Sequence, residues 1–140
     1  YISQNKLLIC AKRGAEPPNN YALNVLTITD SCELVNHNTF KKRDSRDHPA
    51  MYQGVSKNGD NIYIGGTSNF DYYNPFWSTF DSWFHLIKIN PDTSPIWEYW
   101  YGGDAYYFLY SILATKDAGC IMVGNRYDYE TQGQERDIYI

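Results

Sequence analysis

Residues 62–66 have the sequence Ile62-Tyr63-Ile64-Gly65-Gly66, and similar runs occur before and after them in the chain. The similar runs are Leu7-Leu8-Ile9-Cys10-Ala11 and Ile121-Met122-Val123-Gly124-Asn125. Ile64 follows Ile9 by 55 positions, and Val123 follows Ile64 by 59 positions. A second pair recurs in the same order, because Leu26-Thr27-Ile28-Thr29-Asp30 resembles Ile87-Lys88-Ile89-Asn90. A period of this length indicates a repeat architecture in which each repeat is one supersecondary unit.

One complete period is predicted to contain four short strands. Residues 51–56 and 61–68 are expected to pair around the turn Lys57-Asn58-Gly59-Asp60, because Asn-Gly is a strong hairpin signal. Residues 81–90 and 96–101 are the next two expected strands, separated by a proline-containing turn at 91–95. Four antiparallel strands without a helix are typical of a β-propeller blade.

The other two periods are predicted to be incomplete. The last one has expected strands at 109–115, 120–125 and 137–140, and the first one lacks its opening strand. The expected fold class is therefore all-β: a partial β-propeller with four-stranded antiparallel blades, about two and a half of which are present. The expected divisions are an incomplete blade at 1–49, a full blade at 50–107 and an incomplete blade at 108–140.

The last period and a half resembles a recurrent repeat of bacterial β-propellers. The resemblance rests on these segments: Tyr101-Gly102-Gly103, Tyr110-Ser111-Ile112, Thr115-Lys116-Asp117-Ala118-Gly119-Cys120-Ile121-Met122-Val123-Gly124, Asp81 with Trp83 and Leu86-Ile87-Lys88-Ile89-Asn90, Ile96-Trp97, and Asp137-Ile138-Tyr139-Ile140. Ala118 replaces a usual glycine, and the first 50 residues match only loosely. The resemblance implies a secreted or surface-attached bacterial protein, many of which are adhesin-like.

Two sheet faces are expected to lack a neighbouring blade within this chain. A propeller closes a ring of about 4–8 blades, each of which covers the apolar faces of its neighbours. We therefore expect the sequence to belong to a longer polypeptide or to assemble with other chains. The expected partners are a protein or other segments of the same propeller.

The composition argues against several classes of partner. Aromatic residues make up 17% of the chain and the net charge is −4, which disfavours a nucleic-acid partner. No apolar run approaches the roughly 20 residues of a membrane span. Three cysteines, Cys10, Cys32 and Cys120, match no zinc or redox spacing, so we expect buried free thiols, with a Cys10–Cys32 disulfide left open. Neither a metal nor a cofactor is predicted.

The sequence offers no clear catalytic constellation. The three histidines are His37, His48 and His85, and no Gly-x-Ser-x-Gly elbow is present. Asp81 and Asp137 appear at the same repeat position, which favours a structural role for both carboxylates. The prediction is a protein that is not an enzyme, and a propeller glycosidase or lyase is the alternative from another class.

The predicted binding residues lie in an aromatic loop at 69–80. They are Phe70, Tyr72, Tyr73, Phe76 and Trp77. Exposed rings of this kind anchor protein interfaces, and beside Asn and Asp they can also stack on sugars, so glycan binding is the alternative. A third interpretation is that the rings pack onto their own blade. The leading prediction is a non-catalytic binding or scaffolding segment that mediates protein contact or assembly, and Trp97, Trp100 and Tyr106-Tyr107-Phe108 are expected to pack the blades.

Overall fold

The computed structural model describes residues 5–13, 21–42, 46–70, 80–130 and 136–140. These residues form strands and no helix, so the all-β prediction is confirmed. It follows that no described helix could span a membrane. The strands are β1 (Lys6–Arg13), β2 (Ala22–Thr29), β3 (Leu34–Phe40), β4 (His48–Pro49), β5 (Val55–Asn58), β6 (Asn61–Ser68), β7 (Trp83–Ile89), β8 (Pro95–Gly102), β9 (Tyr106–Ala114), β10 (Cys120–Tyr127) and β11 (Arg136–Tyr139).

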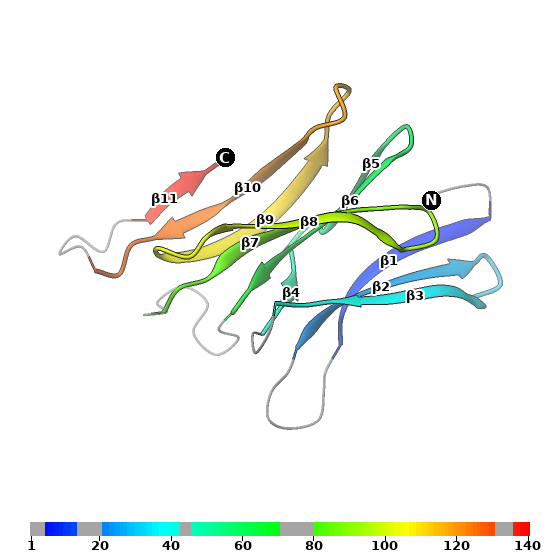
Figure 1. Cartoon of the computed structure of the whole chain (residues 1–140), viewed down its shortest axis with the longest axis horizontal. Helices are drawn as coiled ribbons and strands as arrows, with labels where there is room; N and C mark the ends of the chain where they lie inside the picture. The colour runs from blue at the N-terminus through cyan, green and yellow to red at the C-terminus, as the bar shows by residue number, and fades with distance from the viewer. Residues whose placement is uncertain (1–4, 14–20, 43–45, 71–79, 131–135) are drawn as a thin grey trace.

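The strands form three antiparallel sheets (Figure 1). The first sheet has the order β1-β2-β3, and the third has the order β11-β10-β9. The central sheet has the order β4-β6-β7-β8, and β5 also pairs with β6. The first and third sheets lie on opposite sides of the central one, so the chain is a stack of three sheets.

Strand alternation explains why the central sheet is covered on both faces. Successive side chains of a strand point to opposite faces. Ile62 and Ile64 of β6 enter a core with the first sheet, whereas Tyr63 enters a core with the third sheet. Strand β7 alternates in the same way, since Ile87 and Ile89 belong to the former core and Phe84 and Leu86 to the latter. A strand buried on both faces is expected to be mostly apolar, as β6 is from Ile62 to Gly66 and β7 is apart from His85 and Lys88.

The repeat between the first and central sheets is confirmed by the pairing. Ile9 pairs with Leu26 in the first sheet, as Ile64 pairs with Ile87 in the central one. These are the positions that the sequence comparison matched, 55 and 61 residues apart, so the two sheets repeat one pattern.

Strand β10 of the third sheet corresponds to β6 of the central sheet, but in a register that differs by one residue from the one that the sequences suggest. A Cβ atom placed on Gly66 would meet Leu23 of the first sheet, and one placed on Gly124 would meet Phe84 of the central sheet. Gly124 therefore corresponds to Gly66, and Val123 does not correspond to Ile64. A slip of one residue reverses the face of every side chain in a strand, so the prediction for this strand was wrong in register.

A second correction concerns Asp81 and Asp137. Gly66 pairs with His85 and Gly124 pairs with Tyr139, so Tyr139 takes the place of His85. Two positions earlier, Asp137 then corresponds to Trp83 rather than to Asp81. The two carboxylates do not share a repeat position.

A third correction concerns the expected strand at 51–56. The structure places β5 at Val55–Asn58, and residues 51–53 run beside β9 instead. The N–H of Met51 donates to the carbonyl of Leu109 at 3.1 Å, and the N–H of Ile112 donates to the carbonyl of Gln53 at 3.0 Å. A parallel bridge also joins Gln53 to Ser111. This segment therefore links the central sheet to the third one.

Candidate functional site

The predicted aromatic loop falls mainly outside the described residues. Tyr72, Tyr73, Phe76 and Trp77 all lie there. Phe70 is described and is buried, with 8% of its surface exposed. Its ring lies 4.6 Å from the ring of His48 and 5.0 Å from that of Phe108. Phe70 therefore follows the packing interpretation of the loop at this one position.

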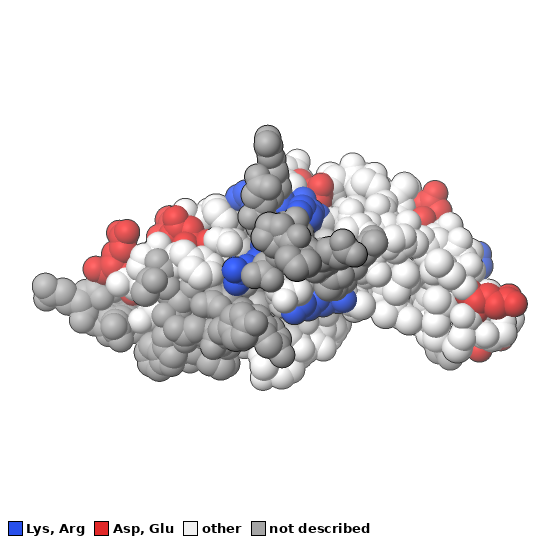
Figure 2. Space-filling view, turned by 90° about the horizontal axis from the view of Figure 1, so that it is seen from below, with Lys and Arg blue, Asp and Glu red and all other residues white. Residues whose placement is uncertain are grey.

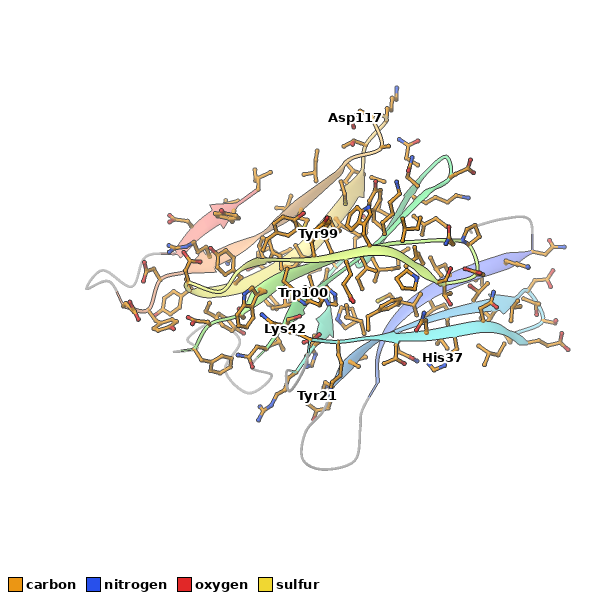
Figure 3. All side chains as sticks on the ribbon, viewed as in Figure 1. Tyr21, His37, Lys42, Tyr99, Trp100 and Asp117 are labelled. Carbon is orange, nitrogen blue, oxygen red and sulfur yellow. The ribbon has the colours of Figure 1, made fainter. Side chains whose placement is uncertain are left out.

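The predicted packing residues are divided between the core and the surface. Tyr106, Tyr107 and Phe108 are buried, whereas Trp97 and Trp100 are half-buried. The two tryptophans lie on opposite faces of β8, because Trp97 pairs with Lys88 and Trp100 pairs with His85. Figure 3 labels Trp100 and its neighbour Tyr99 on this strand.

His85 lies in a buried polar cluster between the first and central sheets. Its Nε2 lies 2.8 Å from a carboxylate oxygen of Glu98, and its Nδ1 lies 3.7 Å from one of Asp47. Trp100 stacks on its imidazole, with ring centroids 4.8 Å apart and planes at 20°. The side chains of His85 and Asp47 are both 0% exposed. Both groups are closed to solvent, and through Glu98 and Trp100 the cluster joins the outer strand β8 to β7.

Charged groups of both signs occur on the face of the molecule that Figure 2 shows. Figure 2 shows Lys and Arg near the middle of one face and Asp and Glu toward both of its ends. Lys42 and Arg46 belong to the loop before β4, and the Lys42 ammonium lies 3.1 Å from the ring centroid of Trp83. Among the described residues, no three His, Cys, Asp or Glu side chains form a group that could hold a metal ion.

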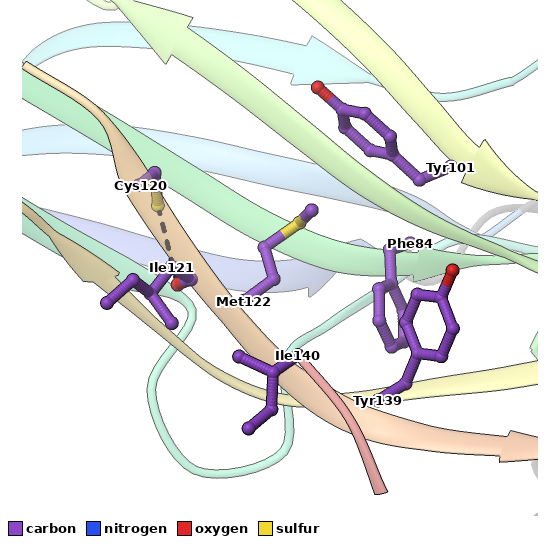
Figure 4. Close-up of a pocket in the computed structure, with 7 residues that line it drawn as sticks. All are labelled: Phe84, Tyr101, Cys120, Ile121, Met122, Tyr139 and Ile140. Carbon is purple, nitrogen blue, oxygen red and sulfur yellow. Dashed lines mark hydrogen bonds between the residues drawn. The ribbon is translucent and has the colours of Figure 1, made fainter. Parts of the chain in front are cut away.

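An apolar pocket lies between the central and third sheets (Figure 4). Its volume is about 350 Å³. Four strands, together with the residue after β11, supply the lining residues, which are Phe84, Tyr101, Cys120, Ile121, Met122, Tyr139 and Ile140. None of these side chains carries a formal charge at neutral pH. Burial raises the pKa of the Cys120 thiol to about 11, so this group is a neutral, apolar part of the wall.

Exposed rings continue from the pocket along β8. Tyr101 is 43% exposed and Tyr99 is 55% exposed. The ring centroids of Trp97 and Tyr99 are 5.2 Å apart, and those of Tyr99 and Tyr101 are 6.3 Å apart. Large contiguous apolar patches on a surface mark interaction sites. The pocket and these rings therefore form the candidate binding site.

Sequence reasoning missed this site because it assigned the residues to strands and to packing. No spacing in the sequence marks the site, because its lining residues come from separate strands that only the packing of two sheets brings together.

Comparisons with known proteins give no family assignment. No family model matches the chain, and no curated protein matches it.

Proposed function

We propose that the chain is a segment of a β-propeller, a non-catalytic scaffold whose two outer sheet faces bind further four-stranded sheets of the same repeat. The outer face of the first sheet carries this argument. Leu7, Ile9, Leu26 and Ile28 point away from the central sheet and are partly or substantially exposed. Their counterparts in the central sheet are Ile62, Ile64, Ile87 and Ile89, all of which are no more than 1% exposed.

The contacts between sheets support the same proposal because they occur twice in the same form. Strands β6 and β7 contact β9 of the third sheet, just as β1 and β2 contact β4 of the central sheet. An interface that repeats in this way generates a ring or a helical stack when it is continued. Sheets that twist in the usual sense and pack radially close a propeller.

The outer face of the third sheet is the complementary surface. Leu113 of β9 pairs with Ile121 of β10, and both side chains are exposed, at 56% and 41%. Covering these aliphatic side chains would stabilise the protein by roughly 25 cal/mol for each Å² of apolar surface removed from water. We infer that the physiological partner is another sheet of this repeat, in the same polypeptide or in another chain. The resemblance to bacterial surface repeats supports, as part of this proposal, a location outside the cell.

Single lysine substitutions on the two faces test the proposal. Head-to-tail stacking predicts that the isolated chain self-associates at high concentration in sedimentation velocity. Ile9→Lys and Leu113→Lys each block one face, so each variant alone should remain monomeric or nearly so. A mixture of the two variants should form a 1:1 dimer, because each partner retains the face that the other one needs.

Met51→Lys is the control variant for these experiments. Met51→Lys changes an exposed loop side chain, 52% accessible, and should leave self-association unchanged. Circular dichroism establishes that each variant is folded. A wild-type chain that is folded and monomeric throughout, or a mixture with no dimer, would overturn the proposal.

A further inference from the structure

Positively charged side chains meet at the junction between the first and central sheets, at the end where β1 finishes and β2 begins. Lys12 lies near the end of β1, and Arg46 lies just before β4. Figure 3 labels Tyr21 at this end of the molecule and Asp117 at the opposite end. Figure 2 views the molecule from the end of Tyr21 and shows Lys and Arg near the middle of that face. The cations therefore gather on one surface of a chain whose net charge is −4.

Backbone hydrogen bonds hold Arg46 at the junction of the two sheets. Its carbonyl accepts from the N–H of Phe70, which follows β6, at 2.8 Å. The N–H of the next residue, Asp47, donates to the carbonyl of Tyr21, which precedes β2, at 3.0 Å. Arg46 is half-buried, so solvent and solutes reach it. The segment before β4 thus presents a guanidinium group from a position that both sheets fix.

An aromatic ring positions the second cation. The Lys12 ammonium lies 3.6 Å from the ring centroid of Tyr21, and burial lowers the pKa of this lysine. The Tyr21 ring in turn packs edge-on against His48, with centroids 5.3 Å apart. An ammonium group has three N–H donors, so it can lie over a ring and bind an anion at the same time.

The His48 ring shows that the two cations act on one place. Its pKa falls from 6.5 to about 4, first because the ring is buried, then because of Lys12 and finally because of Arg46. Lys12 and Arg46 come from different sheets and are 34 positions apart in the sequence, yet both act on this ring. The ring therefore lies in a positive field that the fold creates by bringing the two cations together.

The carboxylate next to Arg46 is directed into the protein. One oxygen of Asp47 accepts from the N–H of Lys42 at 2.7 Å and lies 3.7 Å from Nδ1 of His85. The side chain of Asp47 is 0% exposed. Asp47 thus serves the buried cluster around His85, whereas Lys12 and Arg46 are half-buried and face solvent in part.

We propose that Lys12 and Arg46, beside the ring of His48, form a binding site for a compact oxyanion, such as sulfate, phosphate or the carboxylate of an acidic sugar. A surface of one sign raises the local concentration of the opposite ion. Guanidinium and ammonium groups make charge-assisted hydrogen bonds to such oxygens. The net charge of −4 opposes a long polyanion, so the ligand carries isolated anionic groups rather than a nucleic-acid backbone. This site lies between two sheets of the chain itself and does not depend on the proposed stacking of further sheets.

Sulfate, phosphate and glucuronate are the three probes for this site. Calorimetric titration of the full chain at low ionic strength, where screening is weak, should detect at least one of them. Lys12→Gln and Arg46→Gln should each weaken binding at least about tenfold, the usual effect of one hydrogen bond to a charged group. Arg46→Lys, which retains the charge, should weaken binding less than Arg46→Gln.

Lys116→Gln is the matched control, because it removes the same charge from an exposed lysine in the turn between β9 and β10. This turn also contains Asp117, at the opposite end of the molecule (Figure 3). The control variant should bind the probe as the wild type does. Circular dichroism establishes that each variant is folded.

The titration of His48, followed by NMR, reports where the anion binds. Sulfate keeps its full charge over the whole range in which this residue titrates. Bound sulfate should raise the pKa of His48 from about 4 by about one unit, because it offsets the field of Lys12 and Arg46. The other side chains that contact this ring are Tyr21 and Phe70, and Arg46 and Asp47 precede it in the chain.

The outcomes separate the possible ligands and the possible failures. Tighter binding of glucuronate than of sulfate would identify a sugar carboxylate as the group that the site takes, and the reverse order would identify a tetrahedral anion. Three results would each overturn the inference: no binding of any probe, an equal loss in the Lys116 variant, or a His48 titration that bound sulfate does not change.

Discussion

Gly66 lies so close to Leu23 that a Cβ atom on Gly66 would come within 2.8 Å of the leucine Cδ2 atom. The same Cβ atom would lie 2.3 Å from the carbonyl oxygen of His48. Backbone on one side and a buried side chain on the other leave no room for adjustment. Gly66 thus sets the distance between the first and central sheets, as Gly124 does between the central and third sheets.

Gly66→Ala should therefore destabilise the protein by about 1–3 kcal/mol, the usual cost of overpacking a core. The free energy of unfolding in urea measures this loss. Gly119→Ala is the matched control, because the nearest atoms to its added Cβ are the side-chain ends of Thr115 and Asp117. Equal losses in the two variants would show that the close approach at Gly66 is unimportant.

Ala118 replaces the glycine that is usual at this position of the repeat that the sequence resembles. Its φ is 63°, in the left-handed region that L-residues with a Cβ atom adopt at a cost of roughly 1–2 kcal/mol. Its carbonyl accepts a hydrogen bond from the hydroxyl of Tyr63, which holds the turn against β6. The local conformation is thus maintained by a contact from another sheet.

Ala118→Gly should stabilise the protein by up to about 1 kcal/mol, because the relief of strain exceeds the added entropy of the unfolded chain. Thermal unfolding measures the shift. Ala114→Gly, at a buried position of β9, should be destabilising instead. A fall in stability on Ala118→Gly would mean that the left-handed turn is not a source of strain.

The sequence predicted the strands well wherever alternation and turn residues agreed. Strand β6 has the predicted bounds, 61–68, because Asn58-Gly59 starts it and apolar residues fill both faces. Gly59 has φ 58°, as the hairpin turn requires. Here the local signals and the tertiary packing favour the same structure.

Register could not be predicted, because it depends on contacts between sheets. The sequence comparison aligned the single Gly124 with Gly65, the first glycine of the pair in β6. The structure aligns Gly124 with Gly66, since that is where a side chain of the preceding sheet presses on the strand. Which of two adjacent glycines is the spacer is set by Leu23 and Phe84, and neither is near in sequence.

The candidate site was equally beyond local patterns. Tyr101 and Met122 appear as ordinary strand residues in the sequence, and the pocket forms only where the central and third sheets pack together. The polar cluster of Asp47, His85 and Glu98 likewise joins three separate segments. Residues that are brought together only by tertiary structure have no characteristic spacing in the sequence.

His48 should make the stability of the protein depend on pH below neutrality. Its pKa falls from 6.5 to about 4, first because the ring is buried and then because Lys12 and Arg46 are nearby. Between pH 6.5 and 4 the unfolded chain binds a proton at this residue and the folded protein does not. The contribution of His48 to the free energy of unfolding is therefore fully present above pH 6.5 and is lost as the pH falls toward 4.

Urea unfolding at half-unit steps from pH 7.5 to 4.5 measures this dependence. His48→Gln should flatten the curve over the range, although it also disturbs ring contacts with Tyr21 and Phe70. The control is His37→Gln, at an exposed residue of β3, which should retain the slope of the wild type. An unchanged slope in the His48 variant would assign the pH dependence to other groups.

The three thiols should differ sharply in reactivity. All three cysteines are free in the structure, and Cys32 is exposed, contrary to the expectation that all are buried. Burial raises the pKa of Cys10 to about 12 and that of Cys120 to about 11. Because the thiolate is the reactive species, Cys10 and Cys120 should react with an aromatic disulfide reagent at pH 8 at least about a hundredfold more slowly than an ordinary exposed thiol. Cys32→Ser should remove the fast phase, whereas Cys10→Ser should retain it. In denaturant without reductant, all three thiols should react; recovery of only one would reveal the Cys10–Cys32 disulfide that the sequence left open.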